Sequence, residues 1–141
     1  METPELFHGI AHIDIRGKVE YQNSLDLSRF VRAYVIENTV DTPLRAWHGH
    51  HFESKLFIPI AGSWRIGAVK VLDWDRPDPS EKPIVETLSA GRMVCFFVPG
   101  GFANGLLSLE KGSRLLVLSS SSLEASLEDD YRFDPDYWKL A

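Results

Sequence analysis

The stretch KLFIPIAGSWRIGAVKVLDW, from Lys55 to Trp74, decides the fold. It holds two short apolar segments, rich in Ile and Val, on either side of Gly62. This pattern predicts two β-strands joined by a turn that needs positive φ. Short apolar bursts of this kind recur between Gly, Pro, Asn and Asp, so we expect an all-β sandwich or small barrel of about eight strands. The strands are predicted at residues 7–15, 29–38, 55–62, 63–74, 83–91, 92–100, 103–109 and 113–120.

Length and composition limit the class of protein. A chain of 141 residues can close one core without disulfides, so residues 1–141 are predicted to form a single domain. The net charge is -5 and the basic residues are scattered, which argues against a nucleic-acid partner. Cys95 is the one cysteine. The first residues do not resemble a signal peptide, and no apolar run approaches the roughly 18 residues that span a bilayer, so a cytoplasmic protein with no membrane partner is expected.

A second stretch, RAWHGHHFESKLF from Arg45 to Phe57, contains three histidines. In a strand, His48 and His50 would share one face while His51 would point away. An HxH pair of this kind can bind a metal, but a metal site needs at least a third protein ligand. Glu53 would lie on the face of His51 if the strand continued that far. The pattern therefore leaves open a metal site, a proton-transfer site and an ordinary sheet surface.

Two motifs resemble those of the cupin superfamily, whose fold is a double-stranded β-helix, or jelly roll. The first is the spacing from His48 to Gly62, and the second is GRMVCFFVPGGFANG at residues 91–105. Metal-binding cupins carry a Glu and a second-motif His where this chain has Lys55, or Ser54 with a shift of one residue, and Asn104. Because a lysine and an asparagine are poor ligands for transition metals, the resemblance implies no metal.

The substitutions are similar to those of cupins that modify nucleotide-linked keto sugars. RAWH at residues 45–48 and PGGFANG at residues 99–105 resemble motifs of the dTDP-4-dehydrorhamnose 3,5-epimerases. Residues 45–62 align without a gap to the sugar 3,4-ketoisomerases, which are related to the WxcM-like proteins, and HIDIRGKVEY at residues 12–21 resembles a segment of both groups. The resemblance implies a metal-independent isomerase or epimerase that needs no cofactor, acts on a nucleotide-diphosphate 4-keto-6-deoxy sugar and forms a homodimer.

The resemblance also implies roles for individual residues. His48 would be the base that removes a proton next to the sugar ketone, which suits an imidazole that titrates near neutral pH. Lys55 would face the developing enolate oxygen. Asp134 would orient the His48 ring, with Asp136 as the alternative, although an Asp before Pro135 is also typical of a turn cap. The residues expected to bind substrate are Arg16 and Arg45, which would hold the diphosphate, together with His50, Tyr34 and Asn104.

The chain also departs from these families. Val117 stands where the 3,5-epimerases have a tyrosine that acts as general acid, and Ser122 and Leu123 replace a pair of tyrosines. Full 3,5-epimerisation is therefore not expected. A 3,4-ketoisomerase or an epimerase that acts at one carbon needs fewer groups. A sugar-binding cupin without catalysis is the alternative, and a metal-dependent cupin is a third interpretation, disfavoured by Lys55 and Asn104.

Overall fold

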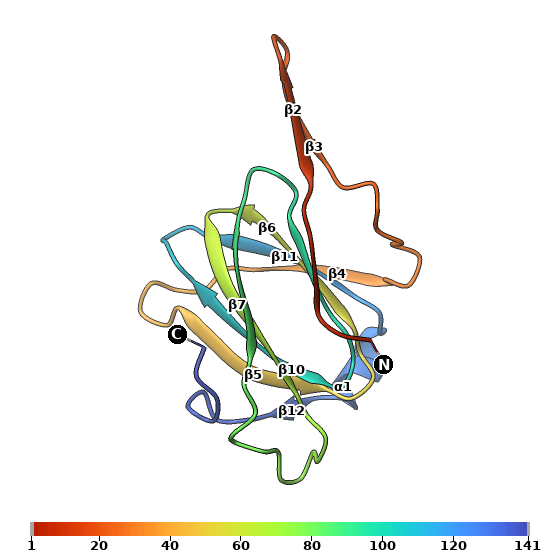
Figure 1. Ribbon diagram of the computed structural model, residues 1–141, viewed down its shortest axis with the longest axis vertical. Coiled ribbons are helices and arrows are strands. Elements are labelled where there is room, and N and C mark those ends of the chain that lie inside the picture. The colour runs from red at the N-terminus through yellow and green to blue at the C-terminus, as the bar shows by residue number, and fades with distance from the viewer. Residues whose placement is uncertain (1, 141) are drawn as a thin grey trace.

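Two antiparallel five-stranded sheets form the body of the protein in the computed structural model, which describes residues 2–140 (Figure 1). The first sheet has the order β1 (Glu5–Phe7), β9 (Cys95–Val98), β6 (Lys55–Ala61), β11 (Arg114–Ser119) and β4 (Arg32–Ile36). The second sheet has the order β12 (Tyr131–Arg132), β5 (Leu44–His50), β10 (Phe102–Ser108), β7 (Ser63–Lys70) and β8 (Ile84–Ser89). The all-β prediction is confirmed.

Two smaller elements lie outside the sheets. β2 (Ile10–Asp14) and β3 (Gly17–Tyr21) pair into a hairpin that projects away from the body (Figure 1). The helix α1 (Leu123–Leu127) begins after Ser122, whose hydroxyl accepts a hydrogen bond from the backbone N–H of Ala125, as is usual for a helix N-cap. Within the described part of the chain, no helix is long and apolar enough to cross a membrane.

The main core fills the space between the two sheets, because alternate residues of each strand point inward. Trp64 and Val117 are both fully buried in this core. Val117 is the cross-strand neighbour of Tyr34. The position at which the 3,5-epimerases have their acid tyrosine is therefore a packing position in this chain.

Each sheet also buries part of its outer face. The C-terminal segment covers the second sheet, where Trp138 packs edge-on against Trp47 at 5.6 Å between ring centroids. On the first sheet, Cys95 and Phe97 lie in a cluster that includes Phe30 from the segment before β4. Burial raises the pKa of the Cys95 thiol to about 11, so it stays protonated. Both layers are thus stabilised by apolar contacts on two faces.

Most predicted strands are present, with four differences. Gly62 has φ 68° at the turn between β6 and β7, as predicted. The single strand predicted at residues 7–15 is divided at Gly9, where a Cβ atom would lie 2.1 Å from the carbonyl oxygen of Arg92. The strands β3, β5 and β12 are absent from the predicted set. The projecting hairpin exists because residues 10–21 fold back at Gly17, which has φ 132°.

Candidate active site

The strand β5 presents His48 and His50 to the space between the sheets. Trp47 and Gly49 occupy the opposite face, where Trp47 lies in the outer core and a Cβ on Gly49 would meet the Trp74 ring at 2.6 Å. The alternation of a strand therefore turns both histidines inward. Asn104 is the cross-strand neighbour of His48 on β10 and is 4% exposed.

Lys55 is the first residue of β6 and supplies a buried ammonium group to the same interior. Its residue is 8% exposed, and its Nζ lies 5.7 Å from the centroid of the Tyr34 ring. Arg32 also lies against that ring, with its guanidinium carbon 5.0 Å from the centroid. Ser119 is the neighbour of both Lys55 and Arg32 in the register of β11, so these side chains form one group across three strands.

Glu53 joins this group, although it lies outside both β5 and β6. Its side chain is fully buried, and its Oε2 accepts a hydrogen bond of 2.8 Å from the Ser119 hydroxyl. The same oxygen lies 3.5 Å from a guanidinium nitrogen of Arg32 and 3.8 Å from Nζ of Lys55. Its other oxygen, Oε1, lies 3.8 Å from Nδ1 of His50 and has no hydrogen-bond partner among residues 2–140. A carboxylate thus stands among two cations and an imidazole.

Asp129 fixes the bend that brings Glu53 inward. Its carboxylate accepts hydrogen bonds from the backbone N–H groups of His51, Phe52 and Glu53, at 2.7, 2.8 and 2.9 Å. Its carbonyl oxygen lies 2.8 Å from Nδ1 of His50. A carbonyl only accepts, so Nδ1 carries the proton and Nε2 is left as a free acceptor. Nε2 of His50 is buried and has no hydrogen-bond partner in the described part of the chain.

The electrostatics of the site keep His48 neutral. The pKa of His48 is lowered to about 4, mainly by burial and then by the positive charges of Arg132 and Lys55, against the opposite effect of Asp130. Arg132 is the cross-strand neighbour of His48 on β12. The pKa of His50 is also lowered, mainly by burial and then by Lys55. Each imidazole therefore has a free lone pair at neutral pH, as a base requires.

Five of the eight predicted site residues lie in this group. The structure brings together His48, His50, Lys55, Tyr34 and Asn104.

Three predicted residues lie elsewhere. Arg16 is at the tip of the projecting hairpin, with its side chain 86% exposed and paired with Asp14 at 2.7 Å. Arg45 is exposed and donates to the Asn38 side chain at 3.4 Å. Asp134 is exposed, and its carboxylate accepts from the backbone N–H of its alternative, Asp136, rather than from His48. The described structure thus does not place Asp134 against the imidazole of His48. It also does not place Arg16 or Arg45 in the group around His48 and Lys55.

Sequence reasoning missed other residues of the site. Arg32 could have been found, because it precedes Tyr34 by two positions and shares its strand face. Glu53 was expected on the face of His51, but β5 ends at His50 and strand alternation ends with it. No short-range signal indicates Ser119 or Arg132, which reach the site through sheet pairing.

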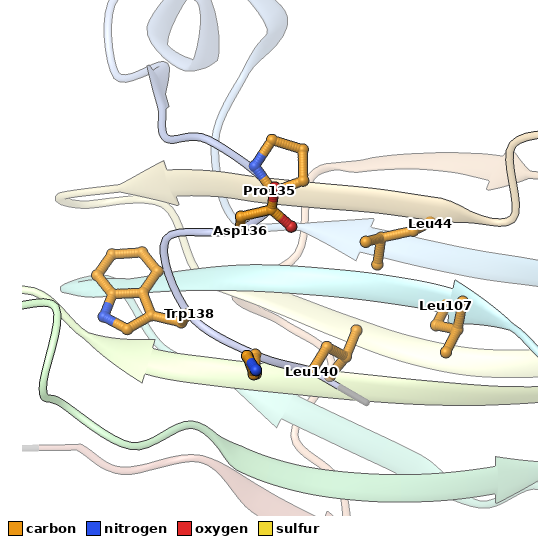
Figure 2. A pocket seen from close by; sticks show the side chains of 7 residues that line it. Leu44, Leu107, Pro135, Asp136, Trp138 and Leu140 are labelled. Atoms are coloured by element: carbon orange, nitrogen blue, oxygen red, sulfur yellow. The ribbon is translucent and has the colours of Figure 1, made fainter.

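Metal ligands do not gather at this site. Within residues 2–140, no group of three or more His, Cys, Asp or Glu side chains has a geometry that could hold a metal ion. A pocket of about 260 Å³ lies instead on the outer face of the second sheet, under the C-terminal segment (Figure 2). Its lining is mostly apolar, with Leu44, Leu107 and Trp138, and also contains Asp136 and Lys139 but no histidine.

Comparison with known proteins gives structural likenesses only. No protein-family model matches the sequence, and no curated protein is similar to it in sequence. A 3,4-ketoisomerase from Helicobacter canadensis is similar in structure, with 20% identity, a TM-score of 0.67 and coverage of 95% of this chain and 93% of that one.

Two epimerases are also similar. The 3'-monoepimerase ChmJ from Streptomyces bikiniensis, in complex with dTDP-quinovose, has 18% identity and a TM-score of 0.76, over 97% of this chain and 74% of that one. An epimerase from Mycobacterium tuberculosis has 16% identity and a TM-score of 0.75, over 95% of this chain and 72% of that one. The chain therefore has the cupin fold of the sugar-nucleotide ketoisomerases and epimerases.

Proposed function

We propose that the protein is a metal-independent isomerase or epimerase that acts on a nucleotide-linked 4-keto-6-deoxy sugar. The observation that carries the proposal is a neutral imidazole, His48, that shares the interior of this fold with the buried ammonium of Lys55. A base and a fixed positive charge are the two groups that proton transfer next to a ketone needs.

The reaction follows from these two groups. The lone pair of His48 takes the proton from the carbon next to the sugar ketone, and the electrons of that C–H bond move into the carbonyl, which becomes an enolate oxygen. Lys55 stabilises the negative charge on this oxygen, which develops only as the reaction proceeds. For a ketoisomerisation, His48 returns the proton to the former carbonyl carbon. The hydroxyl group on the deprotonated carbon gives its proton to the enolate oxygen, so that the ketone moves to that carbon. Protonation of the same carbon on its other face, by a water molecule or a second acid opposite His48, completes an epimerisation.

Tyr34 is the candidate for transfer of the hydroxyl proton. It is the cross-strand neighbour of Val117, so a phenol stands on the strand beside the position at which the 3,5-epimerases have theirs. The cations of Arg32 and Lys55 lie 5.0 and 5.7 Å from the centroid of the Tyr34 ring. A reaction at one face of the sugar needs no second acid from Val117, which favours ketoisomerisation over 3,5-epimerisation.

We propose that the protein binds its substrate through a nucleotide diphosphate group. Arg132 is 70% exposed and adjoins His48 through the pairing of β12 with β5, so it offers a guanidinium group at the edge of the site. The similar protein ChmJ was solved with dTDP-quinovose, and a similar ketoisomerase, QdtA, with TDP. These complexes support a nucleotide sugar as the ligand class.

The alternative is a cupin that binds a nucleotide sugar without catalysis. Two observations favour it: Val117 cannot donate a proton, and Asp134 is held in a surface turn by Asp136 instead of orienting His48. Such a protein would keep the ligand contacts and show no proton exchange.

A proton NMR time course with dTDP-4-keto-6-deoxyglucose in heavy water separates the two proposals. The native protein is expected to place solvent deuterium next to the ketone or to give a new sugar signal. His48→Asn should lose turnover while it retains ligand binding, because the amide cannot act as the base. His51→Asn, at an exposed neighbouring histidine, is the matched control and should keep native turnover. Native turnover in His48→Asn would show that the assignment is wrong, and ligand broadening without exchange in the native protein would support the binding alternative.

Metal analysis of protein purified without a histidine tag tests the metal-independent part of the proposal. Turnover that survives treatment with a chelator is expected. Stoichiometric metal, with activity lost on chelation and restored by that metal, would contradict it.

A further inference from the structure

Glu53 is a buried charged group that the proposed reaction does not use. Its side chain has no exposure to solvent, and burying a carboxylate is costly unless cations and hydrogen bonds compensate. Here the compensation comes from the Ser119 hydroxyl at 2.8 Å, a guanidinium nitrogen of Arg32 at 3.5 Å and Nζ of Lys55 at 3.8 Å. The carboxylate is thus surrounded by groups of the site rather than by the apolar core.

The surrounding backbone holds Glu53 firmly. The carboxylate of Asp129 binds three successive N–H groups, the last of which belongs to Glu53 itself. The backbone oxygens of His51 and Phe52 also lie against Gly100, where a Cβ atom would come within 2.9 and 2.6 Å of them. The bend therefore cannot relax outward without breaking hydrogen bonds to a charged group.

Lys55, by contrast, has few fixed contacts of its own. A lysine side chain is flexible, with an ammonium group that can adopt many positions. Its short-range charged partner is Oε2 of Glu53, and Tyr34 contributes a ring face at 5.7 Å. A charge that stabilises a transition state must be in place before the reaction begins, so an anchor for Lys55 has a direct use.

We propose that Glu53 is a positioning residue that holds the Lys55 ammonium in place beside the reacting sugar oxygen. This inference rests on the proposed function, because it concerns the same site. Oε1 of Glu53, which has no hydrogen-bond partner among residues 2–140, lies 3.8 Å from Nδ1 of His50. The same carboxylate therefore contacts both the Lys55 side and the histidine side of the site.

The first test uses the protein alone and needs no substrate. In a ¹H–¹⁵N spectrum of the lysine ammonium groups at low temperature, a held and buried ammonium exchanges slowly and gives a resolved signal. Lys55→Met assigns that signal. Glu53→Gln, which keeps the size of the side chain and removes its charge, should abolish it. Glu124→Gln, at an exposed glutamate of α1, should leave it unchanged.

A second variant guards against a failure of Glu53→Gln to fold. Ser119→Ala keeps the charge of Glu53 but removes the hydrogen bond that the Ser119 hydroxyl donates to it, so the Lys55 signal should weaken without a loss of fold by circular dichroism. A Lys55 signal that persists unchanged in folded Glu53→Gln, or in Ser119→Ala if Glu53→Gln does not fold, would overturn the proposal.

The second test is a kinetic double-mutant cycle. Glu53→Gln should lower kcat by up to about 100-fold and change KM little, because it misplaces a group that acts in the transition state. In the Lys55→Met background, the same substitution should change kcat by less than about twofold, since no ammonium remains to be held. An equal loss of kcat in both backgrounds would show a merely structural role and overturn the proposal. If the native protein has no turnover, the proposed function fails while the ammonium spectrum still decides the role of Glu53.

Discussion

At the scale of single residues, His48 is neutral because burial and two neighbouring cations oppose its protonation. A base acts in its unprotonated form, so activity is present above its pKa and is lost as the pH falls through it. We predict that kcat/KM declines with a midpoint at about pH 4, rather than at the ordinary histidine value of 6.5. The measurement is kcat/KM against pH, with circular dichroism at each pH to show that the protein is folded. A midpoint near 6.5 would show that another group is the base, or that Arg132 and Lys55 do not act on this ring.

Asp129 gives a second prediction at this scale. Three hydrogen bonds to its carboxylate would be lost in Asp129→Ala, and hydrogen bonds to charged groups contribute about 1.5–3 kcal/mol each, without full additivity. We expect the free energy of unfolding to fall by about 3 kcal/mol in urea titrations. Asp130→Ala is the neighbouring control, because Asp130 has only a surface pair with Arg132, and its cost should stay below about 1 kcal/mol. Equal costs would contradict the role of the three N–H groups.

Residue-level prediction from sequence depended on regular alternation. His48 and His50 were placed on one face correctly because both lie within β5. Glu53 was misplaced because the strand ends at His50 and a distant carboxylate, that of Asp129, sets the direction of the following chain. A contact across 76 positions has no local signature in the sequence.

At the scale of elements, two paired glycines of the second sheet leave room for the Trp47 ring on its outer face. Gly105 on β10 faces Gly67 on β7 in the sheet register, and a Cβ on Gly105 would lie 2.9 Å from the Trp47 ring. We predict that Gly105→Ala lowers the free energy of unfolding by about 1–3 kcal/mol, as overpacking commonly does. The measurement is chemical denaturation of the single variant and of the same change in a Trp47→Leu background, where the smaller side chain should remove most of the penalty. A penalty that stays the same in both backgrounds would exclude the steric cause.

The sequence predicted elements well where apolar runs were bounded by turn residues, and less well at the edges of the sheets. The turn at Gly62 followed from that pattern. The strand β12 has only two residues, so its pairing with β5 leaves no periodic signal. Arg132 takes the place beside His48, whereas the carboxylate of Asp134 accepts a hydrogen bond from the backbone N–H of Asp136 at the surface.

At the scale of the whole molecule, the projecting hairpin exposes apolar side chains that a lone subunit leaves in water. Ile10, Ile13, Ile15 and Val19 are 55%, 73%, 103% and 61% exposed. An exposed apolar patch on a protruding hairpin is typical of a protein–protein contact. We therefore predict that the homodimer implied by the family resemblance forms through β2 and β3. Arg16 would then lie where it could contact a ligand bound to the second copy.

Light scattering tests this dimer. The native protein is expected to have twice the mass of one chain, and Ile13→Lys should shift it toward the monomer by placing a charge in the interface. Leu72→Lys is the matched control, because Leu72 is 78% exposed in the segment between β7 and β8, outside the hairpin. A dimer that persists in Ile13→Lys and dissociates in Leu72→Lys would place the interface at the other end of the molecule.

The buried position of Cys95 has a practical consequence for studying this assembly. Its thiol has no exposure, and burial raises its pKa to about 11, so we expect maleimide reagents, which attack exposed thiolates, to leave it unmodified in the folded protein near neutral pH. The chain as it stands therefore offers no reactive thiol to a labelling reagent. A single cysteine introduced at Val19 would be the one reactive thiol per subunit, and a spin label attached there would report the distance between two copies directly.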